Sequence, residues 1–324
     1  MTNADSAGTT STGGAAVSVA AIVGAPDFIV PWLDRFYDEE DARLVLAAAA
    51  VPPAAEERGG SRSGLDAVPS AALERAVRRA VLDGAEPGAY APASFHARLE
   101  IWAMFEGWKD VPLAVHRRLA EWDLEHYAES IRQSVEAIRD GRPEDSDHAA
   151  YSYILLHEAE DIVAGAEHVY LWPCDCRSIV SSCRKPVDVC LRFSNDRGLG
   201  WEISRERAVD LLRSADKAGL MHTDQLGAGA DGPQGICNCC TDCCYPHLAT
   251  ERLGTGGVWP VRRHVALIDT GLCKTCGRCA LRCPFGAITP DDDGTPAMDA
   301  SLCRGCGLCA TGCTAAAIEM RPLA

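Results

Sequence analysis

Seventeen cysteines lie between Cys174 and Cys313, and none occurs in the first 173 residues. Most are one to three residues apart, and the stretch CNCCTDCC at 237–244 holds five in eight residues. A disulfide needs two Cα atoms several ångströms apart with facing side chains, so thiols this crowded cannot all pair with one another. An odd number of cysteines at C-x-C and C-x-x-C spacings is typical of metal binding in a cytosolic protein. The sequence therefore predicts cysteine-ligated metal centres.

Two segments near the C-terminus repeat one cysteine pattern at an offset of 30 residues. CKTCGRCALRCPFGAI (273–288) and CRGCGLCATGCTAAAI (303–318) both read C-x2-C-x2-C-x3-C, with an isoleucine five residues after the last cysteine. Zinc typically joins two separated C-x2-C pairs in a tetrahedron. Three cysteines in one tight loop suit three corners of an iron–sulfur cube instead. On this duplicated motif, residues 265–320 resemble the bacterial two-[4Fe–4S] ferredoxin family.

The resemblance implies that the last cysteine of each run crosses to the cluster of the other run. Cluster 1 would then be bound by Cys273, Cys276, Cys279 and Cys313. Cluster 2 would be bound by Cys303, Cys306, Cys309 and Cys283. Fully ligated cubes move electrons one at a time and bring no general acid, general base or open metal position. The repeat therefore supports electron transfer.

The other nine cysteines precede the repeat, in CDCRSIVSSCRKPVDVC (174–190) and CNCCTDCC. They are Cys174, Cys176, Cys183, Cys190, Cys237, Cys239, Cys240, Cys243 and Cys244. Arg177, Arg184 and Lys185 lie among them, and cationic side chains offset the negative charge of thiolates. This region resembles cysteine-rich domains that precede ferredoxin modules in bacterial iron–sulfur proteins, a resemblance that brings no established activity.

Three interpretations of these nine cysteines stay open. They could bind one or two additional [4Fe–4S] clusters, a zinc ion alone or with a cluster, or a non-cubane cluster or catalytic dithiol that touches substrate. Within CNCCTDCC, a helix would place Cys239 with Cys243, and Cys240 with Cys244, on one face. A turn could instead bring three of the five to one cube. The neighbouring His222 and His247 are expected to be structural.

The segments that must position the cysteines have recognisable patterns. YILLHEAEDIVAGAEHVYLW (153–172) predicts a helix and then a short strand that delivers Cys174 and Cys176. ISRERAVDLLRSADKAGL (203–220) predicts a helix capped by Ser204 and ended at Gly219. Residues 223–235 are rich in Gly and Asp and are predicted to form a loop. From Phe28 to about Asp140 the apolar periodicity is helical, with Trp and Tyr in the core and a Pro/Gly/Ser-rich break at 52–64.

The predicted fold class is α+β, in four parts. Residues 1–26 are expected to be a disordered tail, and 27–150 a helical domain that ends in a polar linker at 141–150. In that domain ALERAVRRAVLDGA (72–85) could belong to a degenerate winged-helix unit. Residues 151–258 are predicted to form a cysteine-rich α/β domain that binds iron–sulfur clusters or zinc. Residues 259–324 are predicted to form a ferredoxin-like domain with pseudo-twofold symmetry.

Charge and composition exclude several classes of function. The formal net charge of −15 argues against a nucleic-acid partner and suits a soluble protein that meets a basic patch on another protein. The apolar run at 15–25 lacks the preceding Lys or Arg of a secretory signal, and no run approaches the roughly 20 apolar residues of a membrane span. These features are typical of a cytoplasmic protein. No dinucleotide-binding glycine motif, Walker A lysine or H-E-x-x-H motif occurs.

We therefore expect an electron-transfer protein or subunit rather than a stand-alone enzyme. It would relay single electrons through at least two [4Fe–4S] clusters to or from a partner reductase or dehydrogenase. One alternative is a redox-sensing regulator that uses cluster loss as its signal, with Arg75, Arg78 and Arg79 as its basic grouping. Another is a reductase whose upstream cluster is catalytic, through an open iron or a free thiol near Cys237–Cys244.

Overall fold

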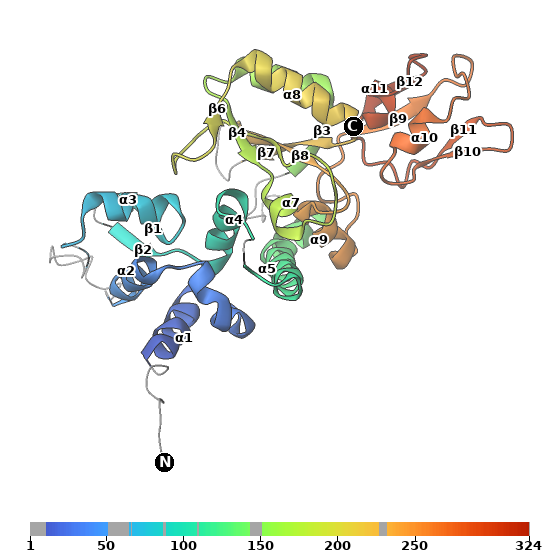
Figure 1. The fold of residues 1–324 in the computed structure, drawn as a ribbon. Helices are drawn as coiled ribbons and strands as arrows, with labels where there is room; N and C mark the ends of the chain where they lie inside the picture. The colour runs from blue at the N-terminus through green and yellow to red at the C-terminus, as the bar shows by residue number, and fades with distance from the viewer. Residues whose placement is uncertain are drawn as a thin grey trace. The chain divides into compact units, whose positions relative to one another are not determined.

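The structure is a computed structural model that describes residues 11–50, 65, 67–86, 89–108, 110–142, 151–226 and 232–323 (Figure 1). The chain divides into two compact units, Met1–Asp123 and Leu124–Ala324. Helices and small antiparallel sheets occur along the chain, so the fold mixes α and β structure as predicted. The predicted break at 52–64 lies outside the described residues, as does most of the predicted linker at 141–150.

The first unit is mainly helical and contains one β-hairpin. Phe36 lies at its centre, with its ring centroid 5.3 Å from that of Phe95 and 4.4 Å from that of Trp102. The elements are α1 (Ser11–Val23), the 3-10 helix η1 (Asp27–Arg35), α2 (Glu39–Ala49), α3 (Ser70–Arg78), β1 (Leu82–Glu86), β2 (Ala89–Pro92), α4 (Phe95–Phe105) and the first part of α5 (Leu113–Arg139).

Two expectations for this unit are wrong. Residues 11–23, predicted to belong to a disordered tail, form α1, because Val19 and Val23 find buried positions against η1 and α2. Residues 1–10 of that tail lie outside the described residues. The helical periodicity predicted from Phe28 to about Asp140 is interrupted, because α3 ends at Arg78 and the chain then enters the hairpin β1–β2. The Asp-Gly and Pro-Gly dipeptides at 83–84 and 87–88 disfavour a longer helix.

The second unit is built on a six-stranded antiparallel sheet with the strand order β3-β7-β8-β5-β4-β6. The strands are β3 (Tyr151–Ile154), β4 (Tyr170–Pro173), β5 (Asp188–Arg192), β6 (Trp201–Glu202), β7 (Met221–Leu226) and β8 (Pro233–Cys239). The helices among them are α6 (Leu156–Gly165), α7 (Asp175–Val180), α8 (Arg205–Lys217) and α9 (Tyr245–Leu253). Figure 1 shows α8 on one side of the sheet and α7 and α9 on the other.

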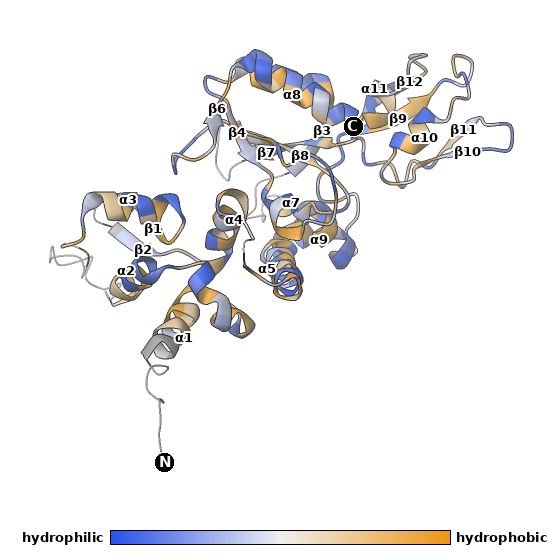
Figure 2. Cartoon of the chain, viewed as in Figure 1, coloured by the Kyte–Doolittle hydropathy of each residue, from blue (hydrophilic) through white to orange (hydrophobic). Residues whose placement is uncertain are grey.

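The sequence predicts several of these elements correctly. Helix α6 is followed by strand β4, which ends directly before Cys174. The hydroxyl of Ser204 accepts a hydrogen bond from the Arg207 N–H at the start of α8. Hydrophobic and hydrophilic residues alternate along α8, as expected for a helix with one face on a sheet (Figure 2). The prediction of a loop at 223–235 is wrong at both ends of that range, because β7 and β8 pair there and satisfy each other's backbone hydrogen-bonding groups. Residues 227–231 lie outside the described part of the chain.

The C-terminal repeat forms two small antiparallel sheets and two short helices. Strand β9 (His264–Ile268) pairs with β12 (Ile318–Pro322), and β10 (Ile288–Pro290) pairs with β11 (Pro296–Met298). Helices α10 (Arg278–Arg282) and α11 (Leu308–Thr311) each contain the third cysteine of a C-x2-C-x2-C run and begin 30 residues apart, as do β10 and β12.

No single helix in the described ranges is long and apolar enough to cross a membrane. The segments Gly14–Val23 and Asp27–Arg35 reach that length and composition only when taken together, and the chain bends by 108° between them.

Candidate metal centres

Four cysteines of the repeat surround a hollow that we call the proximal hollow, with about 310 Å³ of space free of protein atoms, including space open to solvent. They are Cys283, Cys303, Cys306 and Cys309. Cys303 and Cys309 are buried, and the other two are half-buried. Apolar side chains complete the wall, among them Ile288, Met298 and Leu308. The backbone N–H of Ala287 donates to Cys283 Sγ at 3.3 Å.

The other four cysteines of the repeat surround a second, distal hollow, with about 480 Å³ of space free of protein atoms, including space open to solvent. They are Cys273, Cys276, Cys279 and Cys313. Cys276 is exposed and the other three are half-buried. The N–H groups of Thr275 and Ala317 donate to the sulfur atoms of Cys273 and Cys313, each at 3.3 Å. Each hollow therefore gathers three cysteines of one run and the last cysteine of the other.

The residues around the hollows fit an iron–sulfur cluster in their donor set. Burial raises the pKa of the Cys309 thiol to about 12, and it raises the pKa of the Cys306 thiol as well. Such thiols stay protonated at neutral pH unless a cation compensates the charge of the thiolates. Backbone N–H groups directed at sulfur also stabilise a thiolate. Both hollows thus have four sulfur atoms and a backbone N–H group directed at sulfur, and the buried thiols of the proximal hollow favour a positively charged partner.

Gly305 shows how tightly the second cysteine run is held. Its φ is +72°, in the left-handed region that favours glycine. A Cβ at this position would lie 2.2 Å from the carbonyl oxygen of His264, on β9. The loop that carries Cys303 and Cys306 therefore packs directly on the backbone of β9.

Six of the nine upstream cysteines form a second kind of site, which we call the six-cysteine group. Its members are Cys174, Cys176, Cys190, Cys237, Cys239 and Cys244. Each of these thiols affects the pKa of the next in a continuous series, from Cys176 through Cys174, Cys190, Cys237 and Cys239 to Cys244, so their side chains are neighbours. All six are buried or half-buried.

Strand register explains why these sulfurs meet. Leu191 of β5 pairs with Ile236 of β8, which places the adjacent Cys190 and Cys237 side by side. Cys237 and Cys239 are two residues apart on β8 and so share one face of the sheet. Cys174 is the N-cap of α7, and Cys244 is the N-cap of α9, on the same side of the sheet.

Three tyrosines lie near the six-cysteine group, of which Tyr153 is buried and Tyr127 and Tyr151 are half-buried. Burial and the nearby cysteines raise the pKa of Tyr127, Tyr151 and Tyr153 well above its ordinary value, so all three phenols stay protonated. Tyr153 packs with Cys239, Cys244 and Leu308, and Phe285 and Cys306 lie against the same cluster. The rings of Tyr153 and Phe285 are edge-to-face, with centroids 5.9 Å apart. Tyr153 therefore touches both the six-cysteine group and the wall of the proximal hollow.

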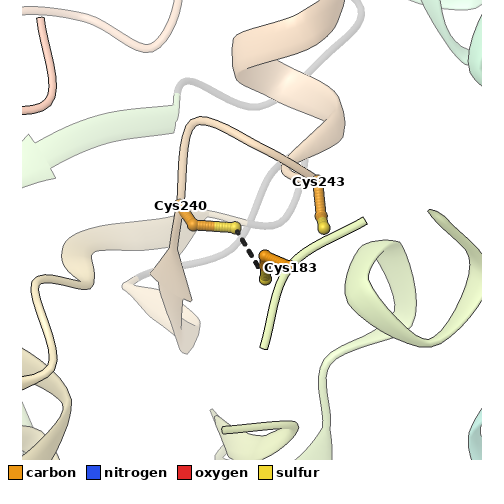
Figure 3. A group of neighbouring side chains, drawn as sticks. All are labelled: Cys183, Cys240 and Cys243. Carbon is orange, nitrogen blue, oxygen red and sulfur yellow. Dashed lines mark hydrogen bonds between the residues drawn. The ribbon is translucent and has the colours of Figure 1, made fainter. Parts of the chain in front are cut away.

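The remaining three cysteines, Cys183, Cys240 and Cys243, form the three-cysteine group (Figure 3). Their sulfur atoms all lie within 4.8 Å of one another, and those of Cys183 and Cys240 are 3.9 Å apart. Cys240 and Cys243 are buried, whereas Cys183 is half-buried. A hydrogen bond from Cys243 and the nearby Arg177 guanidinium lower the pKa of the Cys240 thiol.

The structure therefore divides the five cysteines of CNCCTDCC between two groups. The stretch is the end of β8, a turn and the start of α9, so its helical interpretation is wrong. Three of its cysteines join the six-cysteine group, and two join the three-cysteine group. The C-N-C alternation before the turn was the available signal for a strand that presents two sulfurs on one face.

The two histidines near the cysteines make other contacts. His222 Nδ1 lies 2.6 Å from Asn238 Oδ1, and burial lowers the pKa of His222. Because Asn238 stands between Cys237 and Cys239 on β8, this pair faces the opposite side of the sheet from the six-cysteine group. His247 packs edge-on against Phe285, with ring centroids 5.8 Å apart.

Sequence reasoning missed Tyr153, Phe285 and Arg177 as parts of these sites. Tyr153 and Phe285 were assigned no role, since an aromatic residue beside a cysteine run has no distinctive spacing. Arg177 was noted only as one of several cations. Its position beside Cys240, which lies 63 residues further along the chain, depends on the fold of the sheet.

Comparison with known families identifies part of the repeat. A family model described as a 4Fe-4S binding domain matches residues 266–289, which cover the end of β9, the first cysteine run and the start of β10. A comparison with curated proteins gave no match. The matched segment contains three cysteines of the distal hollow and Cys283 of the proximal hollow. Residues 266–289 are therefore an iron–sulfur region of the ferredoxin type, which binds at least one [4Fe–4S] cluster.

Proposed function

We propose that this chain is an electron-transfer protein or subunit with two [4Fe–4S] clusters in its C-terminal repeat. Cys273, Cys276, Cys279 and Cys313 would hold one cluster, and Cys283, Cys303, Cys306 and Cys309 the other. When bound, such clusters accept and release single electrons. The observation that carries the proposal is that each hollow is lined by four cysteines from the chain itself, which leaves no coordination position for a substrate.

The difference in exposure between the hollows supports a role for the distal end in meeting a partner. Cys276 is exposed there, and Leu272 and Leu281 are 55% and 89% exposed. Electron transfer between proteins requires close approach, so a partner reductase or dehydrogenase would dock at this end. The buried cysteines of the proximal hollow lie deeper in the second unit, against Phe285 and Tyr153.

We infer that the six-cysteine group holds an additional iron–sulfur centre. Its six cysteines are neighbours and are buried or half-buried, and a centre with several metal ions requires that many adjacent sulfur ligands. The ring of Tyr153 contacts both this group and the packing around Cys306, so the two sites are separated by a thin apolar layer. A water-free layer of this kind keeps the two sites close and controls solvent access to each. The additional centre would thus extend the electron-transfer chain inward.

Metal analysis of protein purified without oxygen tests the proposal. We expect at least about eight iron and eight acid-labile sulfide per chain from the repeat, and more if the six-cysteine group is loaded. Cys276→Ser and Cys306→Ser are each expected to remove about four iron atoms, because they target different hollows. A content of only about four iron atoms in the unsubstituted protein would contradict the two-cluster assignment.

A DNA-binding redox regulator is less well supported. Arg75 hydrogen-bonds to Asp41 at 3.0 Å and also pairs with Asp38, and Arg79 pairs with Glu106 at 2.9 Å. Two of the three arginines that could have met phosphate are thus held by carboxylates within the first unit. We propose that nucleic acid is not a partner. DNA retention that falls steeply with salt would favour the regulator instead.

A further inference from the structure

We propose that Cys183, Cys240 and Cys243 form a mononuclear site for a soft divalent cation, with Zn²⁺ as the best fit. This site would be separate from any iron–sulfur centre in the six-cysteine group. The inference goes beyond the proposed electron-transfer function and does not depend on it.

The spacing of the sulfurs carries the argument. Thiolates on one tetrahedral zinc lie about 2.3 Å from the metal and therefore about 3.8 Å from one another. The sulfurs of Cys183 and Cys240 are 3.9 Å apart, and all three lie within 4.8 Å of one another. In a four-iron cube each thiolate binds a different iron atom, so the sulfurs stand much further apart. The three-cysteine group is thus the right size for a single ion.

The surroundings balance the charge of such a site. Arg177 is buried and lies beside Cys240. Its guanidinium donates to the carbonyl oxygens of Pro186 and Asn238, and its buried Nε–H has no acceptor in the described part of the chain. One guanidinium and one divalent cation together compensate three thiolates, so a buried site of this composition carries no net charge.

The fourth coordination position would be open to solvent. The described residues place three potential protein donors in the group, and Cys183 is half-buried. Three protein ligands with an exchangeable fourth are typical of reactive zinc sites, whereas structural sites are closed by four. The nearby hydroxyl of Ser182 lies 3.2 Å from Cys243 Sγ and donates to the carbonyl oxygen of Asp242.

The ion would also join two segments that are distant in sequence. Cys183 lies between α7 and β5, while Cys240 and Cys243 lie in the turn between β8 and α9. In Figure 3 the three side chains converge from these two segments. Cys176 and Cys190 flank the first segment in sequence, and Cys239 and Cys244 flank the second. Metal binding here would therefore hold ligands of the six-cysteine group in place.

Zinc K-edge X-ray absorption on the full protein, purified with its iron and without chelators, tests the inference. The expected result is about one zinc per chain, with three sulfur neighbours at about 2.3 Å and one lighter atom. Cys183→Ser should lose most of the zinc and keep the iron of the repeat. The matched control Cys313→Ser should lose iron and keep the zinc. Cys183 is the residue to replace because it is half-buried, so the substitution disturbs the core least.

Three results would overturn the inference. One is the absence of zinc from protein produced with added zinc, and another is unchanged zinc in Cys183→Ser. The third is a Cys183→Ser variant that loses iron in place of zinc, which would assign the three cysteines to an iron centre. Circular dichroism on the same sample separates each of these from loss of fold. Because the iron content of the repeat is measured independently, a failed zinc site leaves the electron-transfer proposal standing, and the reverse also holds.

Discussion

Gly305 and Thr275 occupy equivalent positions in the two cysteine runs, 30 residues apart, and both have positive φ angles. Thr275 is exposed and keeps a side chain at φ 48°. Gly305 cannot carry one, because its loop lies against the carbonyl oxygen of His264. The two loops thus share a backbone shape but differ in what packs on it. The glycine reflects the buried position of the proximal hollow rather than cluster binding in general.

Gly305→Ala is therefore expected to destabilise the second unit by about 2–4 kcal/mol, from a left-handed alanine and an overpacked contact. The proximal hollow should lose its iron, while the distal hollow keeps its own. Denaturant unfolding and iron analysis measure the two effects. Thr275→Ala serves as the control and should leave both near their original values. If Gly305→Ala leaves the stability and the iron content unchanged, the loop can move away from β9.

At the scale of elements, Arg282 connects the repeat to α8. Its Nε–H donates to the carbonyl oxygen of Leu308 at 2.7 Å, and Nη2 donates to the Asp216 carboxylate at 3.0 Å. The Thr311 hydroxyl donates to the other oxygen of that carboxylate at 2.8 Å. Gly312, the repeat equivalent of Arg282, leaves the necessary space, since a Cβ there would lie 2.3 Å from Arg282 Cδ. One carboxylate of α8 thus binds both short helices of the repeat.

Asp216→Asn should weaken this connection by about 1–3 kcal/mol, because it removes the charge from a hydrogen-bonded pair that is only partly exposed. Amide hydrogen exchange should become faster in α10 and α11 and stay unchanged in α6. Asp210→Asn, at an exposed position on the same helix, provides the comparison. Equal exchange in the two variants would mean that apolar packing alone holds the repeat in place.

At the scale of the whole chain, the two units are stabilised by different chemistry. All seventeen cysteines lie in the second unit. The first unit is held by an ion-pair network, in which Arg98 is fully buried and binds Glu106 at 2.7 Å. Arg79 binds the same carboxylate at 2.9 Å. Acid should therefore destabilise the first unit through the protonation of its carboxylates.

The pKa of Glu106 shows how the stability of the first unit should change with pH. Burial alone would raise its pKa, but hydrogen bonds from Arg79 and Arg98 outweigh burial and hold the pKa below its ordinary value. Its stabilising contribution is complete above the unfolded pKa of about 4.3 and is lost as the pH falls through the lower folded value. Glu106→Gln should lower stability at neutral pH and flatten the loss below about pH 4.3. Thermal unfolding of the first unit across this range is the measurement.

The matched control is Glu39→Gln. Glu39 is an exposed carboxylate in the first turn of α2, whereas Glu106 is bound to the buried Arg98. The control variant should reproduce the original acid dependence. An unchanged slope in Glu106→Gln would assign the acid response to another carboxylate, such as Asp38, whose pKa the neighbouring Arg75 and Arg79 also lower.

The cysteine runs of the repeat could be predicted from sequence because each C-x2-C-x2-C loop is local. Three of its sulfurs meet through one turn, and only the fourth depends on the fold. The upstream cysteines differ in this respect. Their division into six and three depends on the register of β5 against β8, and nothing in a single sequence specifies that pairing. The grouping of the cysteines in the repeat was therefore predictable from sequence, whereas the grouping of the upstream cysteines was not.

The errors in the helical region have a similar origin. The tail was predicted to be disordered from its Ser, Thr, Gly and Ala content, yet Val19 and Val23 are buried in the first unit. Tertiary contacts outweighed composition there. The segment after α3 carried an apolar pattern that fitted a helix, but Val81 and Leu82 are buried through the hairpin instead.

The division of sulfurs in the turn after β8 has a consequence for how this chain can change. Cys243 and Cys244 are consecutive, yet one belongs to the three-cysteine group and the other to the six-cysteine group. Deleting or inserting a single residue between Cys240 and Cys243 would shift both of these cysteines relative to Cys240 and so disturb both groups at once. The length of this turn is thus as constrained as its composition.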